Sequence, residues 1–335
     1  MISSPEKLDR IIKSLLIPYS GLLSVVFGVM ILSFPIGLYV MYNSDVGKEL
    51  NYQYPINGLD MFLGDIGYKV PISFEMGDAF VITWTIFLIL FTISYFGPEN
   101  SLLKTLSNMM SREVKRFQGN AMVNMMAWFS ILILSSVIID AIQQSFGVTM
   151  DAPASSNELV RFFQLGISPL TEETGFRVLL IGVPLFFMYS HIASWKTFVK
   201  SLWRPSKYLS ISDYRKSMIL IITIGLLFGV AHIISGTPWS PGKVTQAAMA
   251  GIIIGWVYVR YGLAPAILVH WATNYFLFSY LFFLSNLSQS SAINDSSNPF
   301  SNTLEVILVT TGIFALAIKI LERIESKKIV SSQSI

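Results

Sequence analysis

The sequence predicts an all-α polytopic membrane protein of about eight transmembrane helices that enclose a polar cavity. Hydrophobic residues make up 53% of the 335 positions and charged residues only 13%, about half of the roughly 25% found in soluble domains. The apolar residues come in blocks long enough to cross a bilayer, which needs about 20 residues. The expected spans are residues 15–42, 79–97, 121–146, 159–190, 217–234, 244–260, 263–285 and 304–320.

Lysine and arginine alternate between the expected loops. They are abundant before the first span and after the second, fourth and eighth, and sparse in the loops between. Cytoplasmic loops carry the excess of these residues, so we expect an integral, multi-pass protein of the cell membrane with both termini in the cytoplasm. The N-terminal segment 1–13 is polar, and the apolar run after it is too long for a signal-peptide core, so we expect a retained first span.

The expected elements form one membrane domain over residues 1–335, without an internal repeat. The first span contains Pro18 and Pro35, which membrane helices tolerate. Residues 43–78 form an acidic polar loop, and residues 285–302 are rich in Ser and Asn. The net charge of +3 is too small to indicate a nucleic-acid partner. With no cysteine, disulfides, thiolate nucleophiles and cysteine metal sites are excluded.

The most informative stretch is residues 171–177, which reads Thr-Glu-Glu-Thr-Gly-Phe-Arg inside an expected span. Ionisable residues at bilayer depth are costly and usually mark a functional site. In a helix, Glu173 and Arg177 are four residues apart and share a face, whereas Glu172 points about 100° away. We therefore expect Glu173 and Arg177 to pair and to fix the helix. This leaves Glu172 free to act on water or on a proton.

Two further polar clusters lie on other expected spans. Phe228 and His232 are four residues apart on the fifth span, as are His270 and Asn274 on the seventh. A lone membrane histidine is usually a hydrogen-bonded structural residue, and Phe228 would then pack against the imidazole. Three polar clusters on three spans instead favour one shared site, because buried polar groups find partners most readily in each other.

These clusters carry a resemblance. In this order they resemble the three signature motifs of the CPBP family of intramembrane proteases. That family includes the CAAX prenyl endopeptidases and bacteriocin-immunity-type (Abi) relatives. The resemblance covers residues 159–285, the motif-bearing catalytic half, and no motif position is missing. The motifs are Glu172-Glu173-x-x-x-Arg177, Phe228-x-x-x-His232 and His270-x-x-x-Asn274.

The resemblance implies an intramembrane endopeptidase that hydrolyses a peptide bond with an activated water. Glu172 resembles the family's water-activating acid and base, and His232 its partner in holding that water. His270 and Asn274 resemble the pair that orients the substrate carbonyl and stabilises the oxyanion. Residues expected to give structural support are Glu173, Arg177 and Phe228. The implied partner is a membrane-associated peptide or protein, lipidated or not, within the lipid bilayer.

Metal use is left open by the residues. Glu172, His232 and His270 would make a catalytic zinc site with an open position for water. The same groups could hold a water without a metal, and this interpretation is slightly favoured.

Two alternatives to a protease also remain. One is a proton- or cation-coupled transporter or channel, although two halves with paired broken helices, the usual transporter signal, are not found. The other is a non-catalytic scaffold or immunity protein on the same fold.

Overall fold

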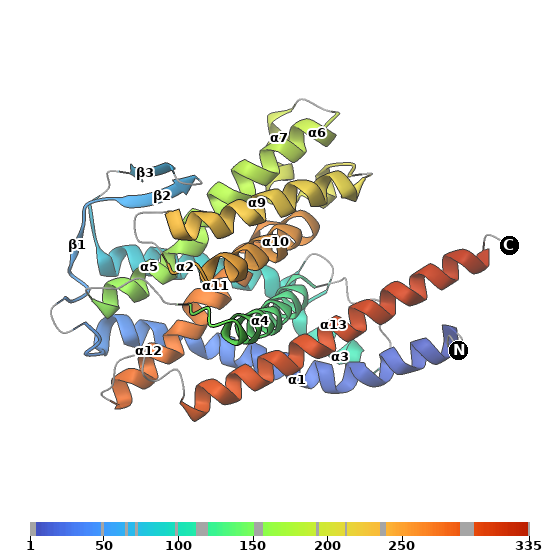
Figure 1. The fold of residues 1–335 in the computed structure, drawn as a ribbon, viewed down its shortest axis with the longest axis horizontal. Helices are drawn as coiled ribbons and strands as arrows, with labels where there is room; N and C mark the ends of the chain where they lie inside the picture. The colour runs from blue at the N-terminus through green and yellow to red at the C-terminus, as the bar shows by residue number, and fades with distance from the viewer. Residues whose placement is uncertain are drawn as a thin grey trace.

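The computed structural model is an α-helical bundle (Figure 1), which confirms the predicted all-α membrane fold. It describes residues 5–47, 50–63, 66–70, 73–97, 100–111, 120–150, 157–191, 194–211, 213–234, 239–288 and 298–333. The α-helices are α1 Pro5–Asn43, α2 Met76–Phe96, α3 Leu102–Met110, α4 Ala121–Ser145, α5 Glu158–Glu173, α6 Val183–Tyr189, α7 Trp195–Trp203, α8 Pro205–Tyr208, α9 Tyr214–Ile234, α10 Lys243–Tyr261, α11 Leu263–Trp271, α12 Leu277–Ser288 and α13 Pro299–Gln333. Two π-helical segments, η2 Thr174–Gly182 and η3 Ala272–Phe276, continue α5 and α11.

Six of the described helical segments are long and apolar enough to cross a membrane, which supports an integral multi-pass protein. They begin and end within a few residues of the expected spans, except that the first and last extend further. The expected spans 159–190 and 244–260 are helical as α5–η2–α6 and α10 but are not among the six, so the count of eight stays a prediction. The six are Lys7–Asn43, Met76–Phe96, Ala121–Ser145, Tyr214–Ile234, Leu263–Ser288 and Pro299–Ser326.

The expected acidic loop contains four short strands. Strands β1 (Pro55–Ile56) and β4 (Phe74–Glu75) pair antiparallel, as do β2 (Leu59–Leu63) and β3 (Ile66–Val70). They lie at the end of the bundle opposite to the two chain termini (Figure 1). Both termini lie at one end because α1 and α13 run past each other in opposite directions.

Some of the segments singled out in the sequence lie partly outside the described residues. In the basic loop after α2, the short helix α3 carries Lys104, but Arg112, Lys115 and Arg116 are outside the described part. Positions 289–297 of the Ser/Asn-rich segment are outside it as well. The basic loop after α6 is described in large part and forms α7 and α8.

Helices α9 and α10 pack closely because glycines line their contact. A Cβ atom added to Gly251 would lie 2.9 Å from Gly225 Cα, and one added to Gly229 would lie 2.5 Å from Val244 O. In membranes, where lipid is as apolar as a side chain, small residues let helices approach and gain van der Waals contact. This close contact positions the end of α9, which carries His232, against the start of α10.

We expect Gly229→Ala to destabilise the protein, because its new methyl group meets backbone atoms that cannot move independently. Overpacking of this kind reduces stability by about 1–3 kcal/mol. Gly28→Ala on α1 is the matched control, since nothing lies within 4 Å of the added Cβ. Thermal unfolding of both variants in detergent micelles measures the difference. Equal midpoints would show that the α9–α10 contact does not depend on glycine.

Candidate active site

The centre of the site is a buried ion pair. Arg177 Nε lies 2.9 Å from Glu173 Oε2, and the two side chains are 1% and 0% exposed. The two atoms are close enough for an ion pair, but their geometry is not that of a hydrogen bond. Arg177 also donates from Nη2 to the carbonyl oxygen of Gly251 at 3.4 Å. Its guanidinium lies 4.5 Å from the centroid of the Phe228 ring, a cation–π contact. One cation therefore connects η2 to α9 and α10.

The other oxygen of Glu173 holds His270. Glu173 Oε1 lies 2.7 Å from His270 Nδ1, and the histidine side chain is 7% exposed. An ionised carboxylate only accepts hydrogen bonds, so Nδ1 carries the proton and Nε2 is left with a lone pair in the neutral ring. The sequence alone did not indicate this contact, because the two residues are 97 positions apart. Glu173 thus does more than neutralise Arg177: it also fixes the orientation of the imidazole.

Glu172 is the accessible member of the two adjacent acids. Its side chain is 19% exposed, against 0% for Glu173. Its Oε2 atom lies 3.8 Å from His270 Nε2. Oε2 is itself buried and has no hydrogen-bond partner among the described residues. With neutral His270, both facing atoms are acceptors. The Nε2 lone pair accepts from Asn274 Nδ2 at 3.3 Å, so a donor that took the place of this amide could bind both atoms from one side.

His232 approaches the same centre from α9. Its Nδ1 donates to the carbonyl oxygen of Phe228 at 2.8 Å, which fixes its tautomer as well. The Phe228 ring lies edge-on to both imidazoles, with centroid distances of 4.8 Å to His232 and 6.0 Å to His270. His232 interacts electrostatically with Glu172 and with His270. The structure therefore brings the three motif-bearing spans together around Phe228.

Asn274 lies beside His270 and is tied back to α5. Its Nδ2 donates to Ser168 Oγ at 2.8 Å and lies 3.3 Å from His270 Nε2. Ser168 was not singled out in the sequence. Its position four residues before Glu172 on α5 was the signal available, since that spacing places both side chains on one helical face.

Two of the three motif-bearing spans change from α to π geometry at the motifs. Segment η2 begins directly after Glu173, and η3 begins two residues after His270 and contains Asn274. Such π-helical turns are rare and frequently occur at functional sites. The wider turn changes the angle between successive side chains, yet the motif partners four residues apart, Glu173 with Arg177 and His270 with Asn274, stay in contact.

Among the described residues, no group of three or more His, Cys, Asp or Glu side chains could hold a metal ion. The Nδ1 atoms of His232 and His270 are engaged by Phe228 O and Glu173, so only the Nε2 atom of each ring could bind a metal. As they are placed here, Glu172, His232 and His270 do not form a zinc site.

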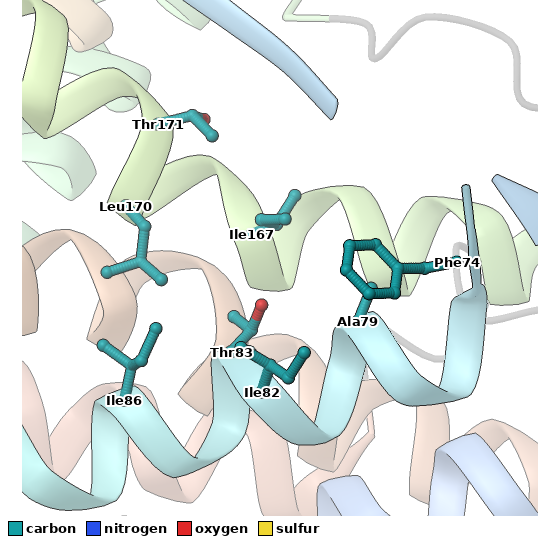
Figure 2. A pocket seen from close by; sticks show the side chains of 8 residues that line it. All are labelled: Phe74, Ala79, Ile82, Thr83, Ile86, Ile167, Leu170 and Thr171. Carbon is teal, nitrogen blue, oxygen red and sulfur yellow. The ribbon is translucent and has the colours of Figure 1, made fainter. Parts of the chain in front are cut away.

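An apolar cavity of about 230 Å³ lies next to the acids, between α2 and α5 (Figure 2). Leu170 and Thr171, just before Glu172, form part of its wall. It is not the polar cavity expected around the motif residues, and that feature stays a prediction. The remaining lining residues come from β4, α2 and α5: Phe74, Ala79, Ile82, Thr83, Ile86 and Ile167.

The three motifs lie in a region that matches a known protein family. Residues 156–276 match the family model described as type II CAAX prenyl endopeptidase, Rce1-like. All three motifs lie within this range, and the match confirms the resemblance to the CPBP family. The matched region is about a third of the chain and supports a CAAX-type intramembrane protease in general. No curated protein and no solved structure matches the chain.

We expect Glu173→Gln to lower stability strongly, because it leaves Arg177 as an unpaired buried charge. Breaking a buried pair in this way reduces stability by about 3–5 kcal/mol. The double variant Glu173→Gln/Arg177→Met removes both charges and should recover most of the loss. Thermal unfolding in detergent micelles measures both effects.

Asp9→Asn is the matched control for this prediction. Asp9 and Lys13 form an exposed ion pair with the same spacing of four residues, and exposed pairs contribute about 0–1 kcal/mol. A double variant as unstable as Glu173→Gln alone would contradict the prediction, because Glu173 would then stabilise the protein through His270 rather than through Arg177.

Proposed function

Since residues 156–276 match the CAAX-protease family, we propose that this protein is an intramembrane endopeptidase whose Glu172 activates a water for peptide-bond hydrolysis. The single observation that supports this most is the pair of facing acceptors, Glu172 Oε2 and His270 Nε2, 3.8 Å apart. A water that donates one hydrogen bond to each, taking the place of the Asn274 amide at Nε2, would be held with an oxygen lone pair directed outwards. That lone pair would attack the carbonyl carbon of a bound peptide.

The proposed proton path uses the accessible acid. Glu172 takes a proton from the water as the new C–O bond forms, and the carbonyl oxygen becomes an oxyanion. Glu172 then gives this proton to the amide nitrogen as the C–N bond breaks, so the products are a carboxylic acid and an amine. Positioned acid–base groups of this kind contribute about 10²–10⁴-fold to rate. Glu173 takes no part in this proton transfer, because Arg177 and His270 hold its two oxygens.

Asn274 and His232 would complete the site. The Asn274 amide donates to Ser168 Oγ and to His270 Nε2; the N–H released from Nε2 when the water binds there can donate a hydrogen bond to the developing oxyanion. His232 holds Phe228 O through Nδ1, and its Nε2, which has no hydrogen bond within the described residues, can help to hold the water. We propose that the water is activated without a metal, because the Glu172–His270 pair already provides two acceptors for it.

The proposed substrate is a membrane-associated peptide or protein. The apolar cavity between α2 and α5 begins one residue before Glu172, at Thr171. It would accommodate an apolar part of the substrate, either a large side chain or an attached lipid.

We also propose that both termini face the cytoplasm. They lie at the same end of the bundle (Figure 1), and the basic residues cluster in the loops expected on that side.

We expect Glu172→Gln to abolish peptide cleavage while the protein stays folded, because only the base is lost and the shape of the side chain is kept. Cleavage of a fluorogenic membrane peptide by purified protein in proteoliposomes is the measurement. Glu158→Gln, in the first turn of the same helix, is the control and should keep full activity. Wild-type-like turnover by folded Glu172→Gln would rule out Glu172 as the base.

Asn274→Ala should lower kcat by about 100-fold or more and change KM much less, because a bond to the oxyanion exists mainly in the transition state. Single-turnover cleavage, normalised to folded protein, measures the effect. Ser168→Ala is the control, because it removes the partner of Asn274 but keeps the amide. We expect it to have a smaller effect.

The double variant Asn274→Ala/His270→Ala tests whether these two residues act together. If they do, it should be hardly slower than the slower single variant. Rate losses that multiply instead would show that the residues act independently, and a shared role at the oxyanion would have to be abandoned.

A further inference from the structure

Lys243, the first residue of α10, has no assigned role and lacks a counter-ion. Its Nζ donates to Gln246 Oε1 at 2.9 Å and lies 4.3 Å from the centroid of the Trp239 ring. Both contacts are with neutral groups. Lys243 makes no ion pair with an acidic side chain in the described part of the chain. An ammonium group held this way is oriented but not neutralised.

The ammonium lies near the histidine-bearing end of α9. It sits over the Trp239 ring, and the Trp239 N–H donates to His232 O at 3.0 Å. Charges in a low-dielectric interior interact far more strongly than they do in water, so a cation held here would attract an anionic group of a peptide bound at the site.

The backbone around Lys243 is fixed at several points. Ser240 Oγ donates to Thr149 O at 3.1 Å, and Gln143 Nε2 donates to Gly242 O at 2.8 Å. The Trp239 N–H donates to His232 O at 3.0 Å. The turn before α10 is thus tied both to the end of α4 and to the histidine-bearing end of α9. The cation is therefore held in place beside the site.

Resting on the function proposed above, we propose that Lys243 binds a carboxylate of the substrate and so determines specificity. A peptide has two sources of this group: the α-carboxylate at its C-terminus and an acidic side chain. Either would supply the negative charge that Lys243 lacks. Glu172 does not supply it, because no ion pair forms between the two and Glu172 Oε2 is without a hydrogen-bond partner in the described structure.

The test compares membrane peptides of one sequence in phosphatidylcholine vesicles, which contain no net-anionic lipid. The first peptide has a free C-terminus and acidic side chains, the second has an amidated C-terminus, and the third has its acidic side chains replaced by amides. Lys243→Met should lower kcat/KM by about 10- to 100-fold for the peptides that keep the carboxylate bound by Lys243, the range for a lost hydrogen bond between charged groups. It should change little the cleavage of the peptide that lacks this carboxylate, which identifies the group as the C-terminus or an acidic side chain. Lys243→Arg should keep the preference.

Lys319→Met is the matched control. Lys319 also lies over a tryptophan, 5.0 Å from the ring centroid of Trp128. Trp128 is near the start of α4, whereas the turn before Lys243 contacts the other end of this helix. The control should show no peptide preference. Equal losses by Lys243→Met on all three peptides, or a loss seen only when anionic lipid is added, would overturn the inference.

Peptide binding to the same variants separates this inference from the function on which it rests. If no peptide were cleaved but Lys243 still set a preference for the carboxylate in binding, the inference would stand and the proposed hydrolysis would fall. If peptides were cleaved with no preference dependent on Lys243, the hydrolysis would stand and the inference would fall. Absence of both cleavage and Lys243-dependent binding would overturn both.

Discussion

The site depends on one buried ion pair whose acid also holds a histidine. A buried ion pair is weak evidence for stability, because desolvating both charges offsets most of their attraction. In this protein the pair instead fixes the positions of other side chains. Glu173 uses one oxygen for Arg177 and the other for His270, and Arg177 contacts both Phe228 and the carbonyl oxygen of Gly251. The pair thus connects α5 and η2 to α9, α10 and α11.

Two adjacent acids can serve different purposes because both lie in α5, where neighbouring side chains point about 100° apart. In a regular α-helix, residues four apart share a face, and this rule correctly suggested Glu173 and Arg177 as partners. The backbone leaves α geometry directly after Glu173. The second π segment lies between His270 and the rest of its span. The change to π geometry arises from packing within the bundle. The hydropathy of these stretches does not distinguish them from an ordinary membrane helix.

Sequence analysis was most successful where the bilayer itself sets the outcome. Helix α4 covers 121–145 where 121–146 was expected, and α9 covers 214–234 where 217–234 was expected, because the length of a span follows from local hydropathy. The contacts of Glu173 with His270 and of Ser168 with Asn274 could not be predicted. They join residues about 100 positions apart, and a single sequence has no information on which helices pack together.

The charged groups of the centre divide between structural support and substrate recognition. Glu172, Glu173 and Arg177 together leave one negative charge when both acids are ionised. Arg177 is held by Glu173, whereas Lys243 makes no ion pair within the described residues. A substrate carboxylate on Lys243 would therefore replace no contact of Glu172, whose Oε2 has no hydrogen-bond partner in the described structure. Recognition of the substrate and activation of the water would then use separate groups of one site.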